Sequence, residues 1–196
     1  MTSAPNIIIN NLILEHCNKS ITTTFTSGLI YIQGNNGAGK SILMDYIGHI
    51  RKIHPNVIHG NDSVIYINQT DFFSPKLSGR DLLEFVYGVD GTTLSYKNFT
   101  QQYSEYISET LLKTMMSKPW GSLSGGERKF LYIIILLSLN REWYILDEPF
   151  ANLDNSKKTS LWNIIDKKLH NGNGIIISSH EYSELLMKRS TATLCI

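Results

Sequence analysis

An α/β fold with a mostly parallel sheet is the fold class that this sequence predicts, and three observations support it. Strand-like apolar runs alternate with stretches of helical periodicity along the chain. One such run, residues 29–33, leads directly into a glycine-rich loop, which a helical pattern follows. The length of 196 residues suits one domain with a substantial buried core. Alternating strands and helices are typical of parallel sheets, because each helix carries the chain back to the start of the next strand.

The first part of the chain is predicted to be rich in strands, because β-forming residues cluster there between turn residues. Helical spacing of apolar residues begins only after the glycine-rich loop, so we expect a helix that starts near Lys40. The strands expected on either side of this helix are 7–14, 21–25, 29–33 and 64–67.

The middle of the chain is more polar and predominantly helical. Ser78 is placed to cap a helix, with Asp81 three residues later in a capping-box position. Helical spacing continues through residues 103–116 and ends before Pro119. We therefore expect a helical subdomain, roughly residues 76–122, inserted into the core that contains the sheet.

Regular alternation of strand-like and helical segments returns in the last third of the chain. No internal repeat, low-complexity tract or long linker separates this part from the rest, so residues 1–196 are expected to form a single domain. The elements predicted here are helix 127–139, strand 143–146, helix 156–169, strand 175–178 and helix 181–187.

The charge balance excludes a strong electrostatic field around the whole protein, since 18 basic and 17 acidic residues leave a net charge of +1. A surface that recruits nucleic acid or anionic lipid is therefore not expected. The longest apolar run, 130–139, is far shorter than the ~20 residues that a membrane-spanning helix needs. Residues 1–5 show no signal-peptide pattern, so the protein is expected to remain in the cytosol.

A phosphate-binding loop is predicted after residues 29–33, because the pattern G-x-x-x-x-G-K-[ST] is matched at every fixed position. Its glycines let backbone amides turn toward one point, and the following helix adds its positive dipole end there. Lys40 is expected to reach the β and γ phosphates of a nucleoside triphosphate, and Ser41 to bind Mg²⁺. A simple turn would leave both side chains unexplained. The loop consists of Gly34, Asn35, Asn36, Gly37, Ala38, Gly39, Lys40 and Ser41.

A second anion site is predicted far along the sequence, at Leu123–Glu127. Ser124, Gly125 and Gly126 offer a hydroxyl and backbone amides just before a predicted helix. One compact chain therefore carries two separate loops with the chemistry to bind phosphate.

Further motifs accompany the two loops. These are Gln69 after the strand 64–67, Asp147 and Glu148 after the strand 143–146, Ala151-Asn152-Leu153-Asp154, and His180 after the strand 175–178. In this order they resemble the ATP-binding-cassette (ABC) ATPases over most of the chain, with Leu123–Glu127 as the signature loop. The resemblance implies a P-loop NTPase core with a mostly parallel sheet and an inserted helical subdomain. The short interval from Ser41 to Gln69 implies a reduced antiparallel β-subdomain.

The resemblance also implies ATP and Mg²⁺ as ligands and a role for each polar group. Asp147 would bind Mg²⁺ together with Ser41 and Gln69, and Glu148 would polarise the attacking water. His180 would contact the γ phosphate, while Gln69 would sense Mg²⁺ and water. Each has an ordinary alternative: paired acids can form a turn or helix cap, a loop histidine is rarely catalytic, and Gln69 can be a polar strand end.

Partners follow from the same resemblance. Two copies, or this chain and a paralogous cassette, would pair head to tail so that each Ser124–Gly126 segment closes over the ATP of the other. Transport would require separate membrane subunits, which would hold the protein on the cytoplasmic face of the inner or plasma membrane. Phe72, Phe73, Phe85 and Tyr87 are candidate contacts for those subunits, although any of them can belong to the subdomain core. The layout is similar to small bacterial exporter cassettes of the haem-exporter and peptide or bacteriocin-exporter kinds.

The alternative function is a soluble ABC ATPase of DNA repair, chromosome organisation or translation. Such proteins usually carry two cassettes, a coiled-coil insertion or a basic surface, and this sequence predicts none of them. A P-loop kinase or GTPase would leave the signature loop and His180 unexplained. The sequence also departs from the family pattern. Glu127 stands where glutamine is usual, and the aromatic residue that normally stacks on adenine has no clear counterpart, since the nearest candidates, His16 and Cys17, lie in a shortened segment.

Overall fold

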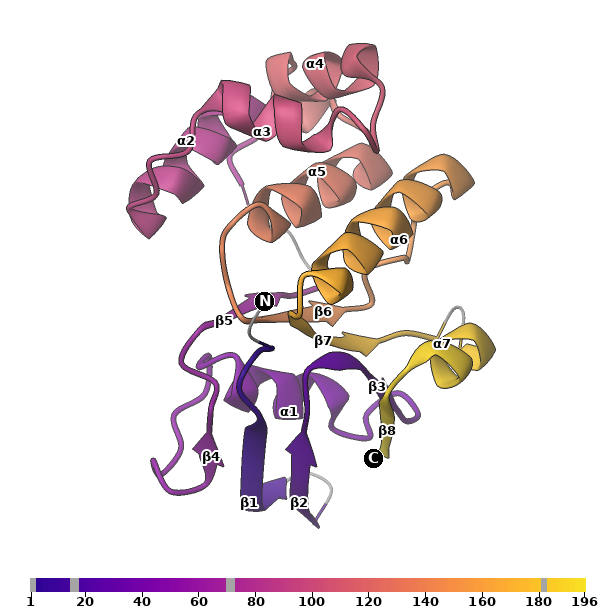
Figure 1. The fold of residues 1–196 in the computed structure, drawn as a ribbon. Helices are drawn as coiled ribbons and strands as arrows, with labels where there is room; N and C mark the ends of the chain where they lie inside the picture. The colour runs from indigo at the N-terminus through magenta and orange to yellow at the C-terminus, as the bar shows by residue number, and fades with distance from the viewer. Residues whose placement is uncertain (1–2, 15–17, 70–72, 181–182) are drawn as a thin grey trace. The chain divides into compact units, whose positions relative to one another are not determined.

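The computed structural model describes residues 3–14, 18–69, 73–180 and 183–196 (Figure 1). The chain divides into two compact units, which we name the sheet unit and the helical unit. The sheet unit comprises Met1–Gln69, Arg141–Ala151 and Lys167–Ile196, and the helical unit comprises Thr70–Asn140 and Asn152–Asp166. The helical unit therefore interrupts the sequence of the sheet unit twice.

A parallel sheet of five strands, in the order β5-β6-β7-β3-β8, is the main sheet of the sheet unit (Figure 1). Every residue of β6 and β7 is buried, as expected for apolar strands with a neighbour on each side. The predicted α/β class with a mostly parallel sheet is confirmed. The strands are β3 (Gly28–Gln33), β5 (Val64–Ile67), β6 (Trp143–Asp147), β7 (Gly174–Ser178) and β8 (Ala192–Cys195).

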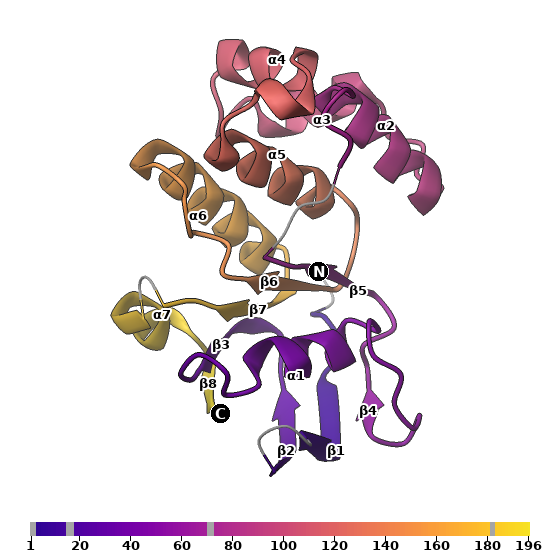
Figure 2. The same cartoon turned by 180° about the vertical axis from the view of Figure 1, so that it is seen from behind.

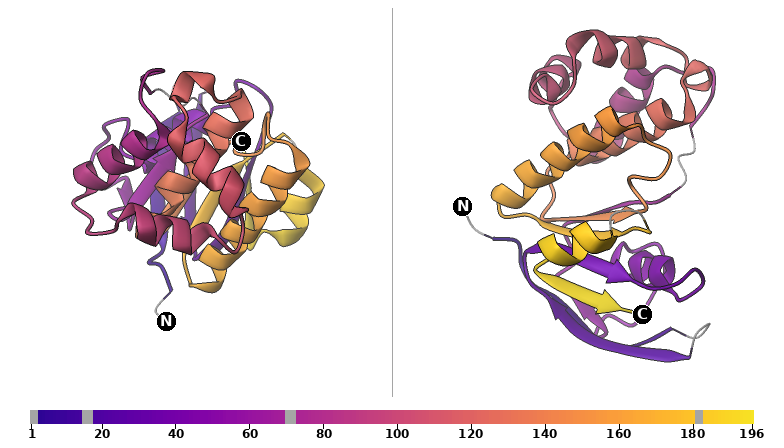
Figure 3. Two further views of the ribbon diagram at one scale, coloured as in Figure 1. Left: turned by 90° about the horizontal axis from the view of Figure 1, so that it is seen from above. Right: turned by 90° about the vertical axis from the view of Figure 1, so that its right-hand side faces the viewer.

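A second sheet has three antiparallel strands in the order β2-β1-β4 (Figure 2). It is the reduced antiparallel subdomain that the sequence predicts. Burial alternates along β1 except at a register shift between Ile9 and Leu12, so one face packs on an apolar core shared with α1. Figure 3 shows β1 and β2 in indigo. The elements are β1 (Ile7–Leu14), β2 (Lys19–Phe25), β4 (Ile58–His59), and the helices α1 (Lys40–Ile47) and α7 (Ser183–Arg189) of the same unit.

The helical unit begins with the predicted capping box. Ser78 Oγ accepts a hydrogen bond of 3.2 Å from Asp81 N, and Asp81 Oδ2 accepts one of 2.7 Å from Ser78 N. None of the helices in the described ranges combines the length and apolar character needed to cross a membrane. The helices are α2 (Gly79–Asp90), α3 (Tyr96–Tyr103), α4 (Glu109–Ser117) and α5 (Gly125–Leu137), with a 3₁₀ turn (Trp120–Ser122), and α6 (Asn155–His170) continues into the sheet unit.

A continuous helix through residues 103–116 was the wrong expectation, because the chain turns between α3 and α4. Ser108 caps α4, because its Oγ accepts a hydrogen bond from Leu111 N. The Tyr106 carbonyl, which helix geometry would otherwise use, accepts a hydrogen bond of 2.7 Å from Ser160 Oγ. Capping and a long-range contact together favour two short helices over one long one.

Gly174, the first residue of β7, is predicted to tolerate no side chain. An added Cβ would lie 2.4 Å from Cε3 of Trp143, a fully buried ring whose Nε1 donates a hydrogen bond of 2.7 Å to the Pro5 carbonyl. We expect Gly174→Ala to lower the free energy of unfolding by about 1–3 kcal/mol in urea denaturation. Gly88→Ala is the control, since a Cβ there meets no described atom within 4 Å apart from its chain neighbours and the backbone of its own helix, and alanine favours a helix. A Gly174→Ala protein of wild-type stability would contradict this packing.

Candidate active site

The phosphate-binding loop connects β3 to α1, as the sequence predicts. Gly39 caps the helix with a φ of 104°, a left-handed conformation that favours glycine. The Lys40 side chain is 8% exposed, and its Nζ donates hydrogen bonds to the carbonyls of Gly34 at 2.8 Å and Asn35 at 3.2 Å. The lysine therefore bends the loop around its own ammonium group.

Asp147, the last residue of β6, is 6% exposed and is held by three hydroxyl groups. Ser41 Oγ donates to Oδ2 at 2.7 Å, and Tyr66 OH donates to the same oxygen at 3.3 Å. Ser178 Oγ donates to Oδ1 at 2.5 Å. Because the donors come from α1, β5 and β7, one carboxylate joins three elements of the sheet unit.

Glu148 follows with a φ of 49°, which is uncommon for a residue other than glycine. Its carboxylate meets His180 twice: the His180 backbone N donates to Oε2 at 3.1 Å, and Nε2 lies 3.6 Å from Oε1. The Glu148 side chain is 12% exposed and that of His180 is 52% exposed, so a sheltered carboxylate lies beside a solvent-facing imidazole.

These groups line one cavity of about 430 Å³ in the sheet unit. The sheet order explains the convergence, because the loop follows β3, Glu148 follows β6 and His180 follows β7, which lies between the other two strands. Gly34 and Asn35 border a neighbouring cavity, and Ala38 lines neither of the two. The predicted site residues that line the first cavity are Asn36, Gly37, Gly39, Lys40, Ser41, Gln69, Asp147, Glu148 and His180, together with Ile42 and Ala151.

The signature loop lies in the helical unit, at the start of α5. Ser124 is the N-cap: its Oγ accepts from Glu127 N at 3.2 Å, and Glu127 Oε2 accepts from Ser124 N at 2.8 Å. The hydrogen bond from the Ser124 backbone lowers the pKa of Glu127, so this carboxylate is ionised at the helix terminus. Ser124 and Gly125 are exposed, whereas a Cβ on Gly126 would lie 2.7 Å from the Asn152 carbonyl oxygen.

Sequence reasoning did not single out Tyr66 and Ser178, the two further contacts of Asp147. Burial, followed by the charges of Asp147 and Asp45, raises the pKa of Tyr66 far above its ordinary value, so the hydroxyl remains a neutral donor. Both residues lie near the carboxyl ends of the strands that flank β6. A polar residue at such a strand end indicates a contact with Asp147 only when the order of the strands in the sheet is known.

The aromatic candidates for partner contacts differ in their environments. Phe73 packs edge to face on Trp120, with ring centroids 5.6 Å apart, whereas Phe85 is 62% exposed. Tyr87 is 5% exposed, and its hydroxyl shares a hydrogen bond of 2.9 Å with Ser138, so of its two interpretations the structure favours a place in the subdomain core. Three residues that the sequence singles out lie outside the described ranges: His16, Cys17 and Phe72.

The fold and the loop between β3 and α1 define the P-loop NTPase class. The family profile described as ABC transporter matches residues 19–151. The cytochrome c biogenesis ATP-binding export protein CcmA of Reclinomonas americana is 30% identical over 210 residues, which cover 97% of this chain and 91% of that protein.

Two further comparisons agree with this match. The zinc import ATP-binding protein ZnuC of Hydrogenovibrio crunogenus is 28% identical over 216 residues, which cover 100% of this chain and 80% of that protein. A solved structure of the ATP-binding subunit of an ABC transporter has the same fold, with a TM-score of 0.81, 20% sequence identity, and coverage of 98% of this chain and 86% of that one. The chain belongs to the ABC transporter family and is the ATP-binding subunit of such a transporter.

Proposed function

We propose that this chain is the ATP-hydrolysing subunit of an ABC exporter and works as a head-to-tail dimer with separate membrane subunits. One observation carries the proposal: Ser41 and Asp147 share a hydrogen bond of 2.7 Å at the same cavity where Glu148 meets His180. A phosphate-binding loop, oxygen ligands for a hard cation and a carboxylate beside a histidine are the groups that triphosphate hydrolysis needs.

The proposed binding of ATP uses the loop and the groups beside it. Backbone amides of residues 34–39 and the Lys40 ammonium bind the β and γ phosphates. The Ser41 hydroxyl, the Asp147 carboxylate and the Gln69 amide oxygen fit Mg²⁺, which prefers oxygen ligands and keeps several waters. When bound there, Mg²⁺ would offset the negative charge of the phosphates.

The proposed chemical step depends on Glu148 and His180. Glu148 accepts a proton from water as the water oxygen bonds to the γ phosphorus. The bond from that phosphorus to the bridging oxygen breaks, and the electron pair remains on ADP. His180 contacts the γ phosphate and orients the water, which its position beside the Glu148 carboxylate supports.

The exposed signature loop supports the dimer. Ser124 and Gly125 lie at the start of α5, where backbone amides and the helix dipole favour an anion. By analogy with the family, we place this loop of each copy over the phosphate-binding loop of the other. A two-fold arrangement then gives a closed dimer with two composite sites.

A membrane partner is supported by the exposed apolar face of α2. Phe85 and Val89, which lie one helical turn apart, are 62% and 76% exposed. Apolar surface of this kind suits a protein partner, and the dimer would then lie at the cytoplasmic face of the membrane. We propose export because CcmA, at 30% identity, is named an export protein, although ZnuC, at 28%, is named an import protein.

Purification from native membranes tests the transporter part of the proposal. A membrane protein that co-purifies in a fixed ratio, and directional transport by the reconstituted complex, are the expected results. Nucleic acid retained on the purified chain, without a membrane protein, would instead favour the soluble ABC ATPase of DNA repair, chromosome organisation or translation.

Ser124→Arg is expected to prevent turnover, because the arginine obstructs the partner's site, while ATP still binds to the variant's own loop. Lys40→Ala removes the phosphate ligand and should also be inactive alone. A mixed dimer of the two variants keeps one intact composite site. Equal mixing should therefore restore roughly a quarter of wild-type turnover, since about half of the dimers are mixed and each has one working site.

Steady-state phosphate release measures this recovery, with each variant alone as the control. Wild-type turnover by Ser124→Arg alone would show that the signature loop does not act on the partner's ATP. Two inactive variants that remain inactive after mixing would contradict the head-to-tail arrangement.

A further inference from the structure

Ser178 is the last residue of β7, and its side chain is fully buried between the two acids of the cavity. Its Oγ donates to Asp147 Oδ1 at 2.5 Å and accepts from Glu148 N at 3.1 Å. A hydroxyl has one proton to donate and two lone pairs that accept. Because the proton is directed to Asp147, the lone pairs are left for the Glu148 amide.

The backbone of Glu148 is strained, so hydrogen bonds from neighbouring residues must hold it in this conformation. Its φ of 49° is unfavourable for a residue that is not glycine, and it persists only where the surroundings impose it. The Glu148 amide donates to both Ser178 Oγ at 3.1 Å and Ser178 O at 3.2 Å. This amide belongs to the peptide that joins the two acids, so its direction sets where the Glu148 carboxylate lies.

We propose that Ser178 is a positioning residue for Glu148, fixing the strained backbone so that the carboxylate faces the attacking water. The inference rests on the proposed function of Glu148. Asp147 orients the Ser178 hydroxyl, and the hydroxyl in turn holds the Glu148 amide. Ser178 itself does not touch the reacting atoms.

Ser178→Ala tests this role, with Ser179→Ala as the matched control. Ser179 is 4% exposed, and its Oγ has no hydrogen-bond partner among the described residues, so removing it deletes a buried hydroxyl without breaking a contact. We expect Ser178→Ala to lower kcat by about 10–100-fold, with the KM for ATP changed less than about threefold. Ser179→Ala should remain within about threefold of wild-type kcat. Ser178→Thr keeps the hydroxyl and should recover most of the lost kcat.

Binding of a fluorescent ATP analogue and the melting temperature are measured alongside kcat. A folded Ser178→Ala protein with wild-type kcat would overturn the inference, as would a kcat loss of the same size in Ser179→Ala. If Ser178→Ala unfolds, Ser178→Thr still decides the point, because a folded threonine variant with low kcat also contradicts the role of the hydroxyl.

A double variant shows through which residue Ser178 acts. In a Glu148→Gln background, Ser178→Ala should change the residual single-turnover rate less than about threefold, because the group that it positions has already lost its function. An undiminished loss in that background would overturn the assignment to Glu148. If Glu148→Gln alone hydrolyses ATP normally, the proposed role of Glu148 fails instead, so the two failures are distinguishable.

Discussion

Glu148→Gln is expected to lower ATP turnover by at least about 100-fold while ATP binding is preserved, because glutamine keeps the side-chain shape but cannot accept a proton. We propose that bound ATP bridges the two copies of the dimer and that hydrolysis releases them, so ATP should hold two copies of this variant together. Phosphate release measures turnover, and size-exclusion chromatography with ATP and Mg²⁺ detects the dimer.

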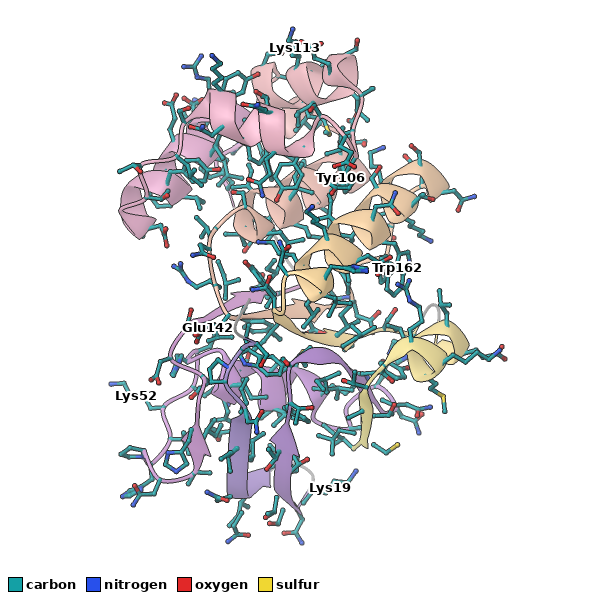
Figure 4. The ribbon with its side chains drawn as sticks, in the orientation of Figure 1. Lys19, Lys52, Tyr106, Lys113, Glu142 and Trp162 are labelled. Carbon is teal, nitrogen blue, oxygen red and sulfur yellow. The ribbon has the colours of Figure 1, made fainter. Side chains whose placement is uncertain are left out.

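Glu142→Gln is the matched control for this variant. Glu142 is an exposed acid of the same unit, one residue before β6 (Figure 4), and lies outside the cavity. It should turn over ATP like the wild type. Wild-type turnover by Glu148→Gln would show that another group accepts the proton and would remove the central role from the proposed mechanism.

Lys40→Ala is expected to weaken ATP binding by about 100-fold or more, because it removes charge-assisted hydrogen bonds to two phosphates. It also removes the contacts of 2.8 Å to the Gly34 carbonyl and 3.2 Å to the Asn35 carbonyl, so the loop loses part of its support. Titration with a fluorescent ATP analogue measures the loss, and the melting temperature shows whether the fold persists.

Lys52→Ala is the control for charge, since Lys52 is an exposed lysine of the same unit (Figure 4). It should bind the analogue with an affinity close to that of the wild type. Wild-type affinity in Lys40→Ala would mean that the loop amides alone bind the phosphates and that the lysine serves only the loop conformation.

Local spacing explains why much of the fold could be predicted from the sequence. The P-loop pattern predicts a strand, a turn and a helix within a short segment, and the structure has β3, the loop and α1 there. The capping box at Ser78 and Asp81 is equally local. For Gln69 and His180, the resemblance to a known family predicted residues that the structure places on one cavity.

The features that could not be predicted depend on contacts between residues that are distant in the sequence. Ser178 meets Asp147 because β7 pairs with β6 in parallel register, and no sequence pattern states that strand order. The turn between α3 and α4 needs Ser160, and the left-handed backbone of Glu148 needs both acceptors of Ser178. Each of these features is imposed by packing against residues that local periodicity does not relate to it.

The position of β3 between β7 and β8 has a consequence for biosynthesis. The ribosome makes β3 well before either of its neighbours, because β7 and β8 both follow it much later in the sequence. At roughly 5–20 residues per second, the nascent strand waits on the order of ten seconds for either partner. During that interval β3 lacks both of its strand partners, and the phosphate-binding loop that follows it has no completed sheet beneath it. The cavity beside the phosphate-binding loop therefore takes shape only after β7 and β8 have been synthesised.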